Sequence, residues 1–155
     1  MKTSKIKNAT YEYKLIAKTL ITEETTPIRD SQDTYKFLIS SVYDKDDLDV
    51  RESFYAVFLD ARANIKGFIK VSEGGINRCP VDPKIIFSAA LKCLASSIVI
   101  SHNHPTGDCT PSQYDKKLTK QLNDVAKLLE IQLLDHIIVS RRNYYSFNDN
   151  FRIEH

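Results

Sequence analysis

The sequence predicts a single α/β domain in which a mixed sheet is flanked by helices. Short apolar runs of strand length alternate along the chain with longer amphipathic segments that suit helices. Two of the strand-like runs, residues 53–60 and 65–71, are separated by the four residues ARAN, which predicts a β-hairpin. The 155 residues contain no internal repeat and no Pro/Gly-rich linker, and they are enough for one hydrophobic core.

The N-terminal half is expected to begin with a strand from Tyr11 to Ile21, where apolar and polar residues alternate. A helix follows, because Asp30 and Ser31 are residue types that cap helix N-termini. Apolar positions at helical spacing give this helix one buried face, made of Tyr35, Leu38, Ile39 and Val42. A charged loop, YDKDDLDVRE, then leads into the first strand of the hairpin.

The C-terminal half is expected to continue with two helices and three strands. Asp82 followed by Pro83 fits the N-cap and first position of a helix. Ser112 then begins a second helix, which is polar and amphipathic. The expected elements are a helix at 84–95, a buried strand at 96–101, a helix at 112–129, a strand at 131–140 and a short strand that follows a turn within 141–147.

Composition and charge exclude several classes of protein. With 22 basic and 20 acidic residues the net charge is +2, so no broad cationic field indicates nucleic acid or an anionic membrane. No apolar run approaches the roughly 20 residues that span a bilayer, and the first residues lack the apolar stretch of a secretory signal. The three cysteines form no disulfide framework, which favours a reducing, cytoplasmic location. We expect residues 1–25 to form a lead-in that packs on a domain of residues 26–155.

The segment from Ser101 to Asp115, SHNHPTGDCTPSQYD, contains the residues that indicate chemistry. His102 and His104 are two positions apart where a buried strand ends, so extended backbone points both imidazoles to the same face. Asp115 lies one turn inside the next helix. Two imidazoles and one carboxylate form a set of three ligands that leaves a fourth tetrahedral position open for water, as in catalytic zinc sites.

Each part of this pattern also has a structural explanation. A single His-x-His is a weak motif, and most histidines bind no metal. Ser112 and Asp115 fit the S-x-x-D capping box of a helix N-terminus, which needs no chemistry. Capping would position Asp115 without occupying both of its carboxylate oxygens, so the two explanations are compatible.

His-x-His, seven residues, Ser, two residues and Asp together resemble the JAMM pattern of MPN/JAB-domain metalloproteases, which is complete in this sequence. The surrounding sequence VISHNHPTGDCTPSQYDKKLTKQL, with LLDHIIVS further along, is similar to the RadC-like branch of that family. The resemblance covers the chain from about Thr26 to its C-terminus. It implies the MPN/JAB1 fold, a cytidine-deaminase-like mixed sheet flanked by helices.

The resemblance also implies a role for each residue of the pattern. One zinc ion per chain would be held by three ligands: His102, His104 and Asp115. Ser112 would help to hold the oxyanion of a tetrahedral intermediate. The family needs a glutamate near the start of an early strand as general base, and Glu52 lies two residues before the apolar run FYAVFLD. Glu73, beyond the second strand of the hairpin, is the alternative base.

The implied reaction is hydrolysis of a peptide or isopeptide bond by a zinc-activated water. The substrate would be a peptide or protein that enters in extended form along a sheet edge, and family behaviour suggests a Gly-containing tail. A second hypothesis is a non-enzymatic MPN scaffold, although a scaffold does not need the complete His-His-Ser-Asp set. A third is a DNA-repair or mobile-element protein that acts near nucleic acid. RadC proteins typically carry a helix-hairpin-helix region before this domain, for which the chain has no room, so we expect no direct binding of nucleic acid.

Other polar residues near the pattern are expected to be structural. Cys109 would be an incidental free thiol, and Asp108 would serve a turn. His136, inside LLDHIIVS, would be a core histidine with satisfied hydrogen bonds. The sequence does not define the oligomeric state, nor the preference for zinc over other divalent ions.

Overall fold

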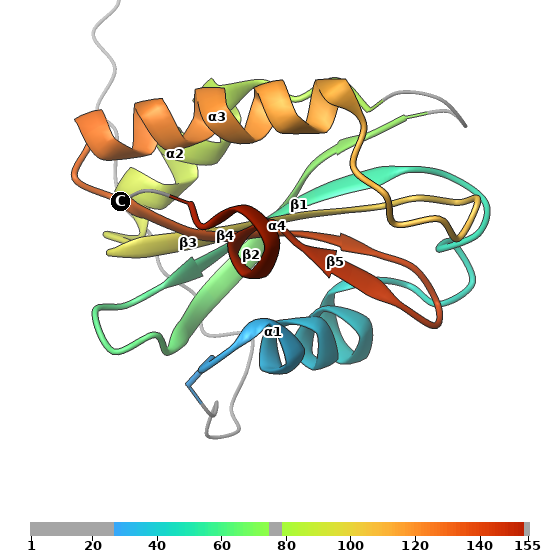
Figure 1. Cartoon of the computed structure of the whole chain (residues 1–155). Helices are drawn as coiled ribbons and strands as arrows, with labels where there is room; N and C mark the ends of the chain where they lie inside the picture. The colour runs from blue at the N-terminus through green and yellow to red at the C-terminus, as the bar shows by residue number, and fades with distance from the viewer. Residues whose placement is uncertain (1–26, 75–78, 154–155) are drawn as a thin grey trace, which may run out of the picture.

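The computed structural model describes residues 27–74 and 79–153, which form a mixed sheet with helices on both faces (Figure 1). In chain order the elements are α1 (Ser31–Phe37), η1 (Leu38–Val42), β1 (Ser53–Leu59), β2 (Ile65–Glu73), α2 (Pro83–Lys92), β3 (Ser97–Asn103), α3 (Gln113–Leu128), β4 (Gln132–Val139), β5 (Tyr144–Ser146) and α4 (Phe147–Phe151). The strand predicted from Tyr11 to Ile21 and the predicted lead-in of residues 1–25 lie outside the described residues.

The sheet has the strand order β2-β1-β3-β4-β5. β1 pairs antiparallel with β2, which confirms the predicted hairpin, and it also pairs antiparallel with β3. β3 and β4 are parallel neighbours connected through α3, and β5 pairs antiparallel with β4. The prediction of a mixed sheet with flanking helices is therefore confirmed. Because β3 and β4 run parallel, their carboxyl ends meet at the same edge of the sheet.

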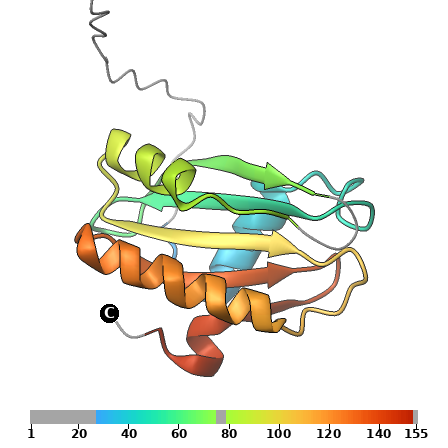
Figure 2. The same ribbon diagram turned by 90° about the horizontal axis from the view of Figure 1, so that it is seen from above.

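Apolar side chains alternate between the two faces of the sheet and form a core on each. α2 and α3 cover one face, where Leu122 of α3 packs with Phe54 of β1 and Ile100 of β3. α1 and η1 cover the other face, where Leu38 packs with Val99 of β3. Figure 2, seen from above, shows α2 and α3 on the near side of the sheet and α1 on the far side. The central strands β1 and β3 are therefore buried on both faces.

Each of the three predicted helix starts has the expected cap. The Asp30 side chain accepts a hydrogen bond from the backbone N–H of Asp33, and Asp82 accepts one from Lys84 with Pro83 at the first helical position. Ser112 caps α3. Capping residues are local signals, which explains why these starts are predictable from sequence alone.

The ends of the elements differ more from the expectations. The last turn of the first helix is π-helical, and α2 ends at Lys92 rather than at residue 95. β3 continues to Asn103, two residues beyond the predicted strand, because it pairs with β1 and β4 over that length. The short helix α4 was not predicted. Within the described part of the chain, none of the helices is both long and apolar enough to cross a bilayer.

Candidate metal centre

The two histidines of the His-x-His motif lie where β3 ends. His102 is paired with Phe54 of β1 and Ile138 of β4, and His104 follows immediately after the strand. Their rings point to the same face, with 3.0 Å between the two Nε2 atoms. The face is the one covered by α3, as the predicted alternation of extended backbone requires. The end of β3 therefore places two imidazole nitrogens next to each other.

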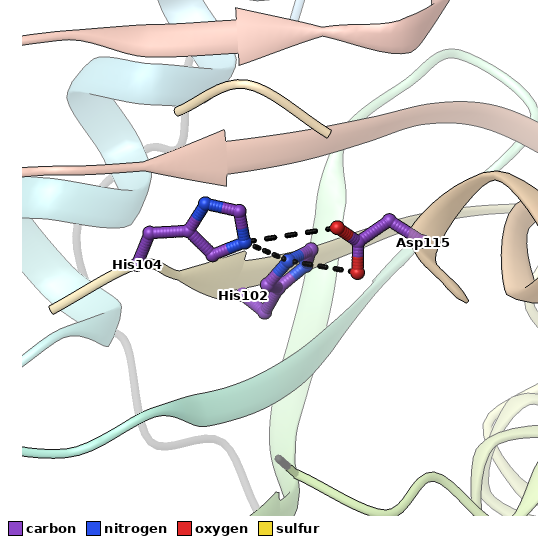
Figure 3. A group of neighbouring side chains, drawn as sticks. All are labelled: His102, His104 and Asp115. Atoms are coloured by element: carbon purple, nitrogen blue, oxygen red, sulfur yellow. Dashed lines mark hydrogen bonds and ion pairs between the residues drawn. The ribbon is translucent and has the colours of Figure 1, made fainter. Parts of the chain in front are cut away.

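The carboxylate of Asp115 approaches the two rings from the first turn of α3 (Figure 3). Its Oδ1 lies 3.3 Å from Nε2 of His102, and its Oδ2 lies 3.7 Å from Nε2 of His104. Ser112 completes the capping box, because its backbone N–H and its hydroxyl both donate to Oδ2 of Asp115, at 2.7 and 2.6 Å. Both capping donors go to the same oxygen, so Oδ1 stays available for another ligand, as predicted.

Electrostatics keep this carboxylate ionised although it is buried. Burial raises the pKa of Asp115, but hydrogen bonds to His102 and His104 outweigh burial and hold the pKa well below its usual range. Burial lowers the pKa of His104, whereas Asp115 and the backbone carbonyl of Asp108 raise it, and the net pKa lies above the ordinary histidine value. The cluster thus combines an anionic oxygen with two imidazoles in a buried setting.

The geometry of the three ligand atoms fits a divalent metal. The atoms that His102, His104 and Asp115 offer all lie within 4.8 Å of one another. Ligand atoms at roughly 2.0–2.1 Å from a tetrahedral zinc lie about 3.3 Å apart. The two Nε2 atoms are 3.0 Å apart, and Oδ1 of Asp115 is 3.3 Å from Nε2 of His102, both close to that value. The side chain of His104 is 19% exposed, so the cluster is open to solvent on that side. An open side leaves room for a water or a substrate atom in the fourth position.

The loop after β3 also sets the proton position on His104. Nδ1 of His104 lies 2.6 Å from the backbone oxygen of Asp108, and a carbonyl oxygen only accepts, so Nδ1 carries the hydrogen. In the neutral ring this leaves the lone pair on Nε2, which faces the cluster. Gly107, at φ +84°, gives the loop the left-handed conformation that closes a turn onto the His104 carbonyl. Metal-binding histidines commonly have such a carbonyl partner.

Glu52, the predicted general base, lies just before β1 on the side of the cluster. Phe54 pairs with His102, so Glu52, two residues before Phe54, lies at the end of β3 that carries the histidines. Its side chain is half-buried, and burial raises its pKa, although the two histidines lower it and Asp115 raises it further. Glu52 makes no side-chain hydrogen bond or ion pair with any other described residue. Its carboxylate is therefore not committed to a structural contact.

Glu73, the alternative base, is the last residue of β2 rather than a residue beyond that strand as predicted, and its carboxylate forms ion pairs at the surface. Its two oxygens lie 2.6 Å from Nη1 of Arg51 and 2.6 Å from Nζ of Lys70. Hydrogen bonds from Lys70 and Arg51 lower the pKa of Glu73. None of His102, His104 and Asp115 is among the described contacts of Glu73. The positions of the two glutamates therefore favour Glu52 over Glu73 as the carboxylate that faces the histidines.

Asn103, which sequence reasoning did not single out, anchors the segment that carries Glu52. Its side chain points to the face opposite the imidazoles, accepts a hydrogen bond from the backbone N–H of Ser53 and donates to the carbonyls of Leu48 and Arg51, each at 2.8 Å. Asn103 is 1% exposed. The signal that could identify Asn103 is an amide side chain between the two histidines of the motif, because a buried amide needs hydrogen-bond partners.

The other polar residues have the structural roles predicted for them. The side chain of Asp108 accepts from the backbone N–H of Thr110 in a turn. Cys109 is buried in a small cluster with Ile138 and Phe147 and is not one of the three residues that could hold a metal. His136 is fully buried, and burial holds its pKa well below the ordinary value, so its ring is neutral. Its hydrogen bond of 2.8 Å to Nδ1 of His102 was not predicted.

Comparison with known proteins agrees with the pattern of these residues. A model of the RadC-like JAB domain matches residues 28–152. A UPF0758 protein of Haemophilus ducreyi is 41% identical over 99 residues, which are 64% of this chain and 44% of that protein. UPF0758 proteins of Thermotoga maritima and Haemophilus influenzae are 36% identical over 115 residues and 37% identical over 127 residues, covering 74% and 81% of this chain and 50% and 56% of their own length.

The chain spans about half the length of the curated relatives it matches. The matched residues include the five strands of the described sheet, its flanking helices and the three residues of the His-His-Asp group. That sheet and its helices are consistent with the JAB/MPN fold, and the group is consistent with a JAMM motif. The chain therefore belongs to the family of RadC-like JAB domains.

Proposed function

We propose that this chain is a zinc-dependent metallohydrolase of the JAMM type, which cleaves peptide or isopeptide bonds. The observation that carries the proposal is the cluster of His102, His104 and Asp115, whose ligand atoms all lie within 4.8 Å of one another with an open side at His104. Zinc bound there would acidify a water and polarise the scissile carbonyl. A scaffold domain has no need for this arrangement, so hydrolysis is favoured over a purely structural role.

Glu52 is the proposed general base. Its carboxylate is half-buried, is close enough to His102 and His104 for both to lower its pKa, and has no structural partner among the described residues. In hydrolysis it would take a proton from the attacking water and pass it to the leaving amine, a role that general acid–base groups fill with gains of about 10²–10⁴ in rate.

Ser112 is the proposed oxyanion donor, and its contacts add a condition. Its hydroxyl donates to Oδ2 of Asp115 and accepts from the backbone N–H of the same residue. To stabilise an oxyanion, the hydroxyl hydrogen must turn from Asp115 towards the substrate. The backbone N–H of Ser112 still donates to Oδ2 when it does so, and thereby keeps Asp115 in position.

The proposed substrate is a peptide or protein in extended form, with a small residue such as Gly next to the scissile bond. The sheet has two edges, β2 and β5, and an exposed strand edge offers backbone groups to which an extended chain can pair. The charge of +2 provides little attraction for nucleic acid, so a DNA-associated role is not favoured. We propose a cytoplasmic location on the basis of the three unpaired cysteines, two of them buried.

The test compares Glu52→Gln with the matched control Glu73→Gln. Zinc content would be measured by mass spectrometry, and hydrolysis with a quenched peptide library and a Gly-Lys isopeptide. The parent and both variants should hold about one zinc per chain, and Glu52→Gln alone should lose roughly 10²–10⁴ in hydrolysis. A parent that binds no added zinc would contradict the proposal. Zinc binding without hydrolysis of any probe would favour the scaffold alternative.

A further inference from the structure

A chain of buried hydrogen bonds leads from the ring of His102 back to the backbone of Asp115. Nδ1 of His102 lies 2.8 Å from Nε2 of His136, and Nδ1 of His136 lies 2.7 Å from Oγ1 of Thr119. Oγ1 of Thr119 in turn lies 2.6 Å from the carbonyl oxygen of Asp115. These four residues are between 0% and 6% exposed, so no bulk water competes for the bonds.

The direction of each bond follows from the carbonyl at the end of the chain. A carbonyl oxygen only accepts, so the single hydroxyl hydrogen of Thr119 points to Asp115. Thr119 must then accept from His136, which places the ring hydrogen of His136 on Nδ1. The ring is completely buried, and no carboxylate is among its described hydrogen-bond partners, so it is neutral and its Nε2 bears a lone pair. Nε2 of His136 therefore accepts from Nδ1 of His102.

We propose that Thr119 and His136 are positioning residues that hold His102 as its Nδ1–H tautomer and so keep a lone pair on Nε2 at the metal site. The inference rests on the metal site of the proposed function and extends it to two residues that touch neither metal nor substrate. A neutral imidazole has two tautomers, and only this one presents a ligand lone pair next to Oδ1 of Asp115.

Packing holds the rings in the plane that this chain needs. The ring of Phe54 stacks on His102, with centroids 5.8 Å apart and planes 7° apart. The ring of Phe147 stacks on His136 at 4.7 Å and 9°. Rotation of either imidazole would break both its hydrogen bonds and its aromatic contact. The tautomer is therefore fixed together with the orientation of the ring.

This series of hydrogen bonds closes into a cycle, because Nε2 of His102 and Oδ1 of Asp115 lie 3.3 Å apart. One path between these two ligands passes through the metal position, and the other passes through His136 and Thr119. This cycle of contacts connects β3, β4 and the first two turns of α3. Loss of the hydrogen bonds through His136 and Thr119 should therefore weaken metal binding. Substitution of a residue that only fills the core should leave metal affinity unchanged.

The experiment uses Thr119→Val, which keeps the shape and removes the hydroxyl, and Thr119→Ser, which restores the hydroxyl. Affinity for Zn²⁺ would be measured by competition with a chromophoric chelator. Nitrogen-15 NMR of the histidine rings in the metal-free chain would report which ring nitrogen carries hydrogen. The proposal expects Nδ1–H on both His102 and His136 in the parent, and a loss of about 10–100-fold in zinc affinity for Thr119→Val. Thr119→Ser should regain most of that affinity.

Two results would overturn the inference. One is a parent spectrum in which His136 carries its hydrogen on Nε2. The other is a folded Thr119→Val chain that binds zinc as tightly as the parent. If Thr119→Val does not fold, the parent spectrum alone decides between the two tautomers. Failure of the proposed function is separable, because absent hydrolysis changes neither readout, and the tautomers are measured without metal.

Discussion

Two buried aspartates, Asp115 and Asp135, have opposite electrostatic outcomes. Both are nearly inaccessible, at 4% and 6% exposure, and both accept hydrogen bonds from the N-terminus of a helix. Asp115 keeps Oδ1 free of capping donors and faces two imidazoles. Both oxygens of Asp135 accept structural hydrogen bonds: the backbone N–H groups of His136 and Asn148 donate to Oδ1, and the hydroxyl of Ser146 donates to Oδ2.

The pKa values of the two carboxyl groups show what the imidazoles contribute. Burial raises the pKa of Asp135 to about 6, although three hydrogen bonds lower it. Burial acts in the same direction on Asp115, but His102 and His104 hold its pKa well below the usual range. Burial alone therefore makes a carboxyl group easier to protonate. A buried carboxylate stays ionised where titratable nitrogens face it, and Asp115 in addition keeps one oxygen that could bind a metal.

The largest expected effect comes from replacing each aspartate by its amide. Asp115→Asn removes the charged ligand oxygen and should lower zinc affinity by more than about 100-fold, beyond the range for residues that only support ligands. Asp135→Asn should leave zinc affinity near that of the parent. Competition with a chelator measures both. Equal losses in the two variants would remove the distinction drawn between these carboxylates.

A second effect concerns stability and pH. Between about pH 4 and pH 6 the folded chain keeps a proton on Asp135 that the unfolded chain has released, since its pKa rises from 3.8 to about 6 on folding. The free energy of unfolding should therefore fall as pH rises through this window, by about 3 kcal/mol at 1.36 kcal/mol per pKa unit. Urea unfolding of metal-free parent and Asp135→Asn chains isolates this slope, which the variant should lack. Parallel pH profiles for the two chains would contradict the assignment.

The smallest effects separate the two helix caps. Ser146 is 2% exposed, caps α4 and donates to Asp135, so Ser146→Ala leaves a buried oxygen without its donor and should cost about 1–3 kcal/mol. Ser112→Ala removes the cap of α3 near the surface and should cost about 1 kcal/mol, because the backbone N–H of residue 112 still reaches Asp115. Thermal unfolding of both variants gives the order. A larger loss for Ser112→Ala would show that the exposed cap matters more than the buried one.

The ligand cluster was predictable because each of its parts depends on a local rule. The alternation of extended backbone places His102 and His104 on one face, and the capping box orients Asp115 at the start of α3. Helix starts at Asp30 and Asp82 followed from the same kind of local signal. The assignment of roles to Glu52 and Ser112 came from the family resemblance and stays a prediction.

The contacts that sequence reasoning missed depend on which strands are neighbours. His136 reaches His102 across 34 positions because β4 pairs in parallel with β3, and the sequence predicted both strands but not their order. Asn103 reaches Leu48 and Arg51 through a loop whose path no local signal specifies. α4, with five residues, is too short for helical periodicity to show in the sequence.

The alternation at the end of β3 also limits how this protein can change over evolutionary time. Asn103 holds the loop on one face of the sheet, while His102 and His104 serve the ligand cluster on the other. An insertion or deletion of one residue in this stretch would exchange the two faces and separate ligands and anchor at once. A substitution alters one face at a time, whereas a change of length here would alter both faces in a single step. Gaps in aligned relatives should therefore be absent from residues 98–104.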